Sequence, residues 1–162
     1  MINLNLSFIE LKAIKSILFK QTIIFLTILK KMELIINTPE EMFELWKKMA
    51  KDHKTILLKW DLWAGKTLFT KGFAKWLGID ENIVQSPTYT YLNSYDNKLL
   101  HIDMYRLEDE NEVWEKWIND QISQFDYITI ERPKFIEILD IQNYIVVNIE
   151  KKREKRVVYI QN

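Results

Sequence analysis

A phosphate-binding loop is the first feature of this sequence that could do chemistry. Ala64-Gly65-Lys66-Thr67 lies between a short apolar run and a segment with helical spacing. Such a loop turns backbone N–H groups toward phosphates, supplies a lysine for their charge and places a hydroxyl on Mg²⁺. These residues match the second half of G-x-x-x-x-G-K-[ST], but Trp60 occupies the first glycine position. An ordinary strand–helix turn with an exposed lysine is the alternative.

Carboxylates end two other apolar runs, at Asp103 and at Glu131. A carboxylate at the end of a strand can bind Mg²⁺, directly or through water, or orient an attacking water. Helix capping and plain surface exposure are the alternatives. For the nearby His101 we expect a structural role, and for Arg106 an ion pair rather than catalysis.

Strand and helix patterns alternate from Met32 onward. Thr38 before Pro39 predicts a helix start, and Glu41 completes a capping box. Apolar residues at spacings of three and four predict helices, whereas short apolar or alternating runs predict strands. The expected helices are 39–50, 67–77 and 108–117, and the expected strands are 33–36, 55–59, 89–95, 99–104, 126–130, 143–149 and 156–160.

This order of elements indicates one α/β domain of the P-loop NTPase kind, with a mixed, mostly parallel sheet flanked by helices. The last two strands should form an antiparallel hairpin around the charged turn 150–155. Gly78 can end the second helix in the left-handed conformation. Tyr89, Tyr91 and Tyr95 alternate along one expected strand, and packing explains them.

Residues 1–31 differ in pattern from the rest of the chain. The apolar run 16–29 is broken by Lys20 and Gln21 and falls short of the roughly 18–20 apolar residues of a membrane span. No small-residue cleavage site follows it, as a signal peptide would require. We interpret 1–31 as a non-native upstream extension before a start at Met32, with an amphipathic or anchoring tail, or a signal, as alternatives.

The composition excludes several kinds of site. Lys plus Arg and Asp plus Glu both number 23, so the formal net charge is zero and no bulk positive field attracts nucleic acid. Any RNA must therefore be held by a local patch or by a partner. The chain has no cysteine, which excludes disulfides, cysteine-bound zinc and iron–sulfur clusters.

Several segments, in order and with matching spacing, resemble the motifs of the TsaE family over roughly 32–160. Lys59–Thr67 (KWDLWAGKT) resembles G-D-L-G-A-G-K-T, Ser86–Tyr89 (SPTY) resembles S-P-T-F, His101–Arg106 (HIDMYR) resembles H-x-D-x-Y-R, and Ile130–Pro133 (IERP) resembles I-E-W-P. Arg132 is a departure, because the family usually has tryptophan at that position.

The resemblance implies a small ATPase. Proteins of this family support formation of N6-threonylcarbamoyladenosine (t6A) on tRNAs that read codons starting with A. They act on the threonylcarbamoyl-transferase TsaD and its catalytically silent paralogue TsaB, and ATP hydrolysis resets that complex. For this chain the resemblance implies a domain over 32–162, ATP or ADP and Mg²⁺ as ligands, a cytoplasmic location and no membrane contact. The neutral charge indicates that contact with tRNA is indirect, mainly through partners.

The resemblance also assigns roles to site residues. Lys66 is expected at the β- and γ-phosphates as a point charge, Thr67 and Glu131 at Mg²⁺, and Asp103 beside the attacking water or the metal. Lys66, Asp103 and Glu131 are the catalytic set. Thr88 is expected as a hydroxyl that senses the γ-phosphate. The remaining nucleotide contacts are expected from Asp61, Leu62, Trp63, Ala64, Gly65 and Arg156.

Tryptophan is abundant in this chain and glycine is scarce. There are 6 Trp and 3 Gly, whereas average glycine usage of roughly 7% predicts about eleven. All six tryptophans fall where the TsaE pattern favours glycine, and Trp60 and Trp63 lie in the loop itself. A Cβ at such a position blocks close approach of the backbone to phosphate. We hypothesise that UGA codons, which some bacteria read as glycine, are translated here as tryptophan; a decayed paralogue is the rival.

Two alternative functions remain open. A nucleotide-free interaction module, with only its partner surface in use, is favoured if Trp60 and Trp63 are real, and magnesium-dependent ATP binding would exclude it. A P-loop kinase for a small molecule would need an acceptor pocket and a lid, and the sequence has no long arginine-rich lid segment.

The source gene tests the tryptophan hypothesis directly. We expect UGA at the codons for Trp60 and Trp63, in a host that decodes UGA as glycine, and sequencing the gene would check this. UGG at these codons would mean that the tryptophans are real and that the phosphate site is blocked.

Overall fold

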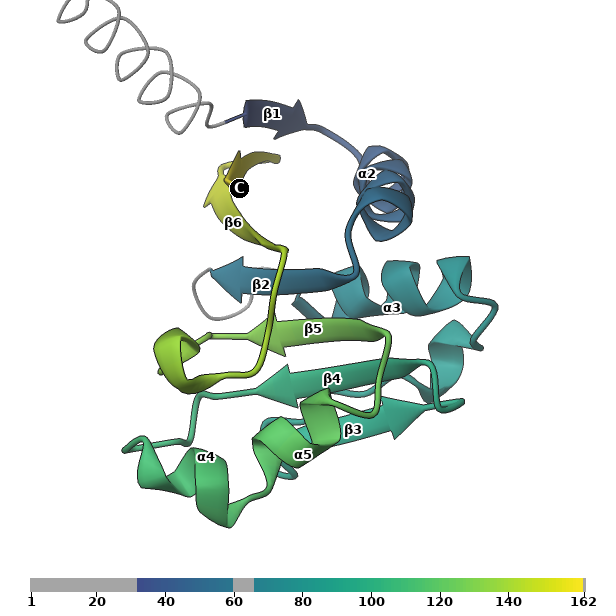
Figure 1. The fold of residues 1–162 in the computed structure, drawn as a ribbon. Coiled ribbons are helices and arrows are strands. Elements are labelled where there is room, and N and C mark those ends of the chain that lie inside the picture. The colour runs from purple at the N-terminus through teal and green to yellow at the C-terminus, as the bar shows by residue number, and fades with distance from the viewer. Residues whose placement is uncertain (1–31, 60–65, 162) are drawn as a thin grey trace, which may run out of the picture.

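Seven strands form one mixed sheet in a computed structural model of the chain, which describes residues 32–59 and 66–161 (Figure 1). The strands are β1 (Met32–Ile36), β2 (Thr55–Lys59), β3 (Leu92–Tyr95), β4 (Leu99–Asp103), β5 (Tyr127–Glu131), β6 (Tyr144–Lys152) and β7 (Lys155–Gln161). Their order across the sheet is β1-β7-β6-β2-β5-β4-β3. The neighbours β6, β2, β5 and β4 are parallel, and the outer pairs β1·β7, β6·β7 and β3·β4 are antiparallel. The mixed α/β sheet and its terminal hairpin are therefore confirmed, with the parallel part confined to the centre.

Helices cover both faces of the sheet. They are α2 (Pro39–Asp52), α3 (Lys66–Trp76), α4 (Asn111–Glu115) and α5 (Ile118–Ile122), with short 3-10 turns η1 (Glu81–Ile83) and η2 (Ile136–Ile138). Buried side chains of α2 and α3 pack with Ile56 and Leu58 of β2 in one core. Leu57, which points to the opposite face, packs in a second core with residues of α4 and α5. Successive side chains of β2 thus point to opposite faces of the sheet, and each face carries a hydrophobic core, as expected for a strand buried on both faces.

Local signals in the sequence set the helix ends. Thr38 Oγ1 accepts the backbone N–H of Glu41 at 3.1 Å, and Glu41 Oε2 accepts the backbone N–H of Asn37 at 2.7 Å. The reciprocal cap forms with one difference from the prediction, because the glutamate reaches the residue before the cap. Gly78 follows α3 with a φ of 76°, which confirms the left-handed stop.

Three predicted element boundaries were wrong. The strand expected over 89–95 begins only at Leu92, because residues 87–90 form a turn and Tyr91 has a φ of 65°. The helix expected over 108–117 is reduced to α4, because Trp117 takes a φ of 55° and separates it from α5. The terminal strands extend to Lys152 and from Lys155, so the turn is tighter than 150–155.

The interpretation of residues 1–31 lies outside the described residues. Among the helices of 32–59 and 66–161, none is long and apolar enough to cross a membrane.

The described tryptophans occupy contrasting environments, whereas Trp60 and Trp63 lie outside the described residues. Trp46 is 1% exposed and meets Phe69 edge-on at 4.3 Å between ring centroids. Gly72 makes room for this indole, since a Cβ there would lie 2.9 Å from it. Trp117, in contrast, is 69% exposed in a left-handed conformation that suits glycine. The geometry at Trp117 is thus of the kind that the hypothesis of translated glycine codons predicts, and the packing at Trp46 is not.

This contrast gives a stability prediction. Trp117→Gly should leave the free energy of unfolding unchanged or raise it by up to about 1 kcal/mol, because a left-handed L-residue is relieved. Trp46→Gly should lower it by about 3–5 kcal/mol through loss of a buried aromatic. Urea denaturation of both variants checks this, and equal losses for the two would contradict it.

Candidate functional site

The carboxyl ends of the central strands meet at one edge of the sheet. In the parallel register Leu58 of β2 pairs with Glu131 of β5, and Glu131 pairs with Asp103 of β4. The next residue of β5, Arg132, donates its backbone N–H to Leu58 O at 3.0 Å. Helix α3 begins at Lys66. Ligands of open α/β sheets bind at this edge, outside the carboxyl ends of the strands.

Polar side chains form a buried layer between the sheet and α3. Along β4 and β5 they alternate with Leu100, Ile102, Ile128 and Ile130, which point into the other core. The polar members are His101, Asp103, Thr129 and Glu131 from the strands and Thr70 from α3, and each is at most 1% exposed. Burying so many polar groups costs free energy unless they serve one another or a ligand. This layer is therefore the strongest candidate for the site.

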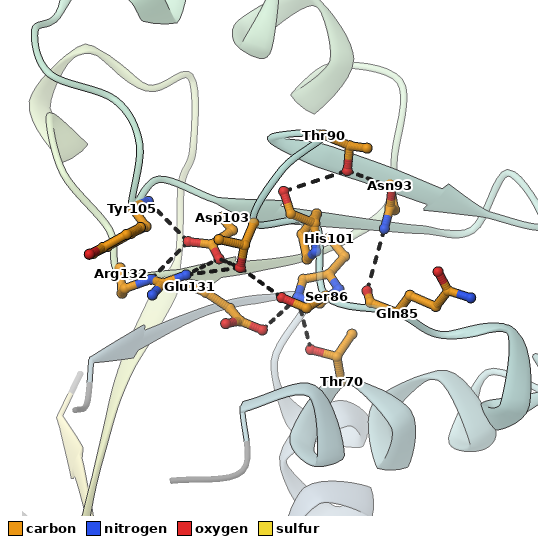
Figure 2. A network of polar contacts seen from close by, with 12 residues as sticks. Thr70, Gln85, Ser86, Thr90, Asn93, His101, Asp103, Tyr105, Glu131 and Arg132 are labelled. Carbon is orange, nitrogen blue, oxygen red and sulfur yellow. Dashed lines mark hydrogen bonds and ion pairs between the residues drawn. The ribbon is translucent and has the colours of Figure 1, made fainter. Parts of the chain in front are cut away.

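A histidine links α3 to a strand-end carboxylate (Figure 2). His101 Nε2 lies 2.9 Å from Glu131 Oε1 and 3.4 Å from Thr70 Oγ1. His101 Nδ1 is buried with no hydrogen-bond partner among the described residues. The structural role expected for His101 is thus to hold Glu131 in place under the first turns of α3.

Asp103 is the centre of a second network (Figure 2). Its Oδ1 accepts the backbone N–H of Tyr105 at 3.0 Å and Arg132 Nε at 2.9 Å. Its Oδ2 accepts Thr88 Oγ1 at 2.6 Å and also Arg132 Nη2. Arg132 Nη2 in addition donates to Thr88 Oγ1 at 3.1 Å, and Ser86 Oγ lies 2.8 Å from the same hydroxyl. Both carboxylate oxygens are engaged, so Asp103 could orient a water only after Arg132 is displaced.

These contacts decide the ionisation of Asp103. Burial alone would raise the pKa of this carboxyl group, but hydrogen bonds from Arg132, Thr88 and the Tyr105 backbone outweigh it and hold the pKa below its ordinary value. Asp103 is therefore ionised at neutral pH. The guanidinium that balances it also lies over the ring of Tyr105, with Cζ 4.2 Å from the centroid.

The predicted site residues are distributed as follows. Lys66 and Thr67 open α3, and Thr88, Asp103 and Glu131 lie at or beside the strand ends described above. Asn148 of β6 pairs with Lys59, the last residue of β2. Arg156 of β7 pairs with Lys151, which lies three residues farther along β6. Arg156 is therefore at the same edge of the sheet as the end of β2. The expected phosphate-loop residues Asp61, Leu62, Trp63, Ala64 and Gly65 lie outside the described residues.

Sequence reasoning missed two members of the networks. Arg132, which differs from the family pattern, is the cation of Asp103, and Thr70 of α3 contacts His101. The alternation of His101 and Asp103 with apolar residues was the available signal, because it places both on one face. The expected ion pair of Arg106 was wrong for the described residues: its Cζ lies 5.4 Å from the ring centroid of Tyr89, and none of their ion pairs includes it.

The donors at this edge suit a hard cation. Among residues 32–59 and 66–161, no group of three or more His, Asp or Glu side chains could hold a metal by itself. The Glu131 carboxylate and the Thr67 hydroxyl are oxygen donors of the kind that Mg²⁺ prefers. Because Mg²⁺ usually takes few protein ligands and completes its shell with water and phosphate, such a sparse set fits it.

Comparison with known proteins gives a consistent result. The family model described as "Threonylcarbamoyl adenosine biosynthesis protein TsaE" matches residues 36–158. The tRNA threonylcarbamoyladenosine biosynthesis protein TsaE of Aquifex aeolicus is 33% identical over 136 residues, or 77% of this chain and 94% of that protein. Its namesake from Bacillus subtilis is 48% identical over 80 residues, and that match spans 46% of this chain but only 50% of the relative. The crystal structure of Bacillus subtilis YdiB matches with a TM-score of 0.60 and 28% identity, covering 81% of this chain and 84% of that one.

The Asp103–Arg132 pair predicts a pH-dependent stability. The wild-type pair stabilises the fold above the ordinary aspartate pKa, and this contribution is lost as pH falls through the lowered pKa. Arg132→Met leaves a buried carboxylate without its cation and should cost about 3–5 kcal/mol at neutral pH. Burial then raises the pKa of Asp103, so protonation relieves the cost and the difference from wild type should narrow toward about pH 5.

Urea denaturation at both pH values measures this difference. Arg106→Met is the matched control, because Arg106 is exposed and its loss should change the free energy of unfolding by less than about 0.5 kcal/mol. A loss for Arg132→Met that is the same at both pH values would contradict the assignment of its cause to Asp103.

Proposed function

Because the chain belongs to the TsaE family of threonylcarbamoyladenosine biosynthesis proteins, we propose that it binds and hydrolyses ATP as an accessory subunit in forming t6A on tRNA. The observation that carries the ATPase part is the pairing of two buried strand-end carboxylates, Asp103 and Glu131, beside the strand that leads into α3. Strand ends of this kind present acidic groups to a phosphate-bound metal.

Each site residue then has a role in the proposal. Lys66 neutralises the β- and γ-phosphates, and the amino end of α3 adds positive potential. Thr67 and Glu131 would hold Mg²⁺, which supplies charge neutralisation of the phosphates when bound. Arg156 reaches the nucleotide from the terminal hairpin. Asp61–Gly65 complete the phosphate loop.

The second network suits control of turnover in this proposal. Thr88 donates a hydrogen bond to Asp103, and Arg132 donates hydrogen bonds to both of them. Thr88 can sense a γ-phosphate only by exchanging one of these partners, and Asp103 can orient water only by releasing another. Slow turnover by the chain alone is the expected consequence, with partner binding favouring the exchanged arrangement.

A cavity at the same edge offers a place for the adenine ring. It has a volume of about 360 Å³ and is lined by Pro39, Phe43, Trp46 and Leu68, with Glu40 and Glu44 at its border. Leu68 is in the first turn of α3, so this cavity adjoins the proposed phosphate site. Mostly apolar cavities of roughly 300–1,000 Å³ are typical of ligand sites.

The proposal extends to partners and location. TsaD and TsaB are the proposed protein partners, with tRNA held mainly by them, and the cytoplasm is the proposed compartment. The zero net charge of the chain supports indirect contact with most of the tRNA.

A nucleotide-free interaction module is the second candidate. The observation in its favour is that Trp60 and Trp63 stand at glycine positions of the loop. Indole side chains at both positions would keep the backbone from phosphate. The two candidates differ in one measurable property, which is magnesium-dependent ATP binding.

Lys66→Ala tests the ATPase directly. We expect ATP turnover to be lost while cooperative thermal unfolding is kept, since the substitution is at the first residue of α3. Lys71→Ala, later in the same helix, is the matched control and should keep turnover. Both are measured by phosphate release and circular dichroism, in the chain as written and in the Trp60→Gly/Trp63→Gly variant. Absence of magnesium-dependent ATP binding in both backgrounds would favour the interaction module.

A further inference from the structure

A second cavity includes Thr88 in its lining, and the proposed ATP chemistry makes no use of its other lining residues. Its volume is about 780 Å³, and Thr88, Tyr89, Tyr91, Tyr105 and Arg106 contribute to its lining. The rest of the lining comes from Leu107, Glu108, Glu112 and Lys134. The cavity therefore touches the loop after Thr88, the segment after β4, the start of α4 and the segment after β5.

Each tyrosine of this cavity carries a cation on its ring. Arg106 Cζ lies 5.4 Å from the centroid of Tyr89, and Arg132 Cζ lies 4.2 Å from that of Tyr105. The third pair is Lys116 Nζ, 4.3 Å from the centroid of Tyr91. Contacts of this kind occur about once per 70–80 residues in proteins. Their gathering around one cavity is therefore a local feature that needs an explanation.

Core packing does not explain Tyr89, one of the three tyrosines for which the sequence predicts a packing role, nor does it explain Tyr105. Tyr89 is 82% exposed and Tyr105 is 51% exposed. The segment that carries Tyr105 is nonetheless held in place: Lys134 Nζ donates to Tyr105 O at 3.0 Å and to Leu107 O at 2.6 Å. Exposed aromatic rings beside such a held segment can stack on a planar ligand.

The charged side chains around the cavity indicate which chemical groups a ligand would carry. The cations are Arg106, Lys116, Arg132 and Lys134, and the nearby carboxylates are Glu108, Glu112 and Asp103. Asp103 is neutralised by Arg132, and Glu112 pairs with Lys116 at 3.4 Å. Arg106 has no carboxylate partner among the described residues and is free to meet a phosphate, while Glu108 can accept from an exocyclic amino group.

We propose that this cavity binds a nucleotide of single-stranded RNA, with its base stacked on Tyr89 or Tyr105 and its phosphate at Arg106. An unpaired base can enter such a cavity, whereas a base inside a duplex cannot. The zero net charge of the chain limits the contact to one or two phosphates. Binding of RNA does not require ATP turnover, but Thr88 borders both sites and couples them.

Fluorescence anisotropy with a short labelled single-stranded RNA tests the proposal on the full chain. We expect saturable binding at low salt, with a slope of log K against log [salt] of only about −0.7 to −1.4. Tyr89→Ala should weaken binding roughly ten- to a hundredfold, through loss of a stacking platform. Tyr89→Phe keeps the ring and should bind like wild type. Arg106→Ala should make the salt slope shallower by about 0.7.

Controls separate this site from the proposed ATP site. Tyr144→Ala removes an exposed tyrosine of β6 that does not line the cavity and should bind RNA normally, as should Lys66→Ala, which should lose only ATP turnover. A photoreactive base in the RNA should cross-link to the segments that contain Tyr89 and Tyr105.

Several results would overturn the proposal. No saturable RNA binding at low salt would do so, as would binding that is unchanged in both Tyr89→Ala and Arg106→Ala. If a free nucleoside monophosphate displaced the labelled RNA when both were present at equal concentration, the cavity would be assigned to free nucleotides instead. Binding of an acidic peptide without binding of RNA would make it a protein-docking site. None of these results depends on whether the chain hydrolyses ATP.

Discussion

A carboxyl group buried at the edge of a sheet must have hydrogen-bond partners, because a buried polar group without them costs free energy. Asp103 and Glu131 are both in this position, at no more than 1% exposure. Glu131 is bonded by His101, and Asp103 by Arg132 and Thr88. These partners come from separate segments of the chain. The two carboxyl groups therefore fix how the ends of β4 and β5 and the loop before β3 converge, and His101 links this junction to Thr70 of α3.

Arg132 shows how closely this requirement is tied to the backbone. It has a φ of 50°, which is unfavourable for a residue with a Cβ. The ion pair with Asp103, the stacking on Tyr105 and the N–H bond to Leu58 O together hold it there. Release of the guanidinium would remove the first two of these restraints. The same residue thus connects the end of β2, the polar layer and Tyr105 in the wall of the cavity of about 780 Å³.

The sequence was sufficient for features that depend on local periodicity. The order of strands and helices, the cap at Thr38, the stop at Gly78 and the strand-end carboxylates follow from spacing and residue type. Features that depend on contacts between distant residues were not available from it. Arg132 meets Asp103 across 29 positions of the chain, and Tyr91 leaves the expected strand because β3 begins after a turn. Local propensity is overridden in such places by tertiary contacts.

The two kinds of tryptophan environment also bear on the nucleotide. Trp46 lines the cavity proposed for adenine and fills space beside Gly72 and Phe69. If the cellular protein had glycine there, that cavity would become larger and α2 would lose both a core contact and helix propensity. A bound base could then occupy part of the space and offset the loss, since a ligand that binds only the folded state stabilises it. Glycine at Trp117 would need no such compensation, because the backbone there is already left-handed. One translational cause for all six residues therefore implies a domain whose core beside α2 depends on its ligand.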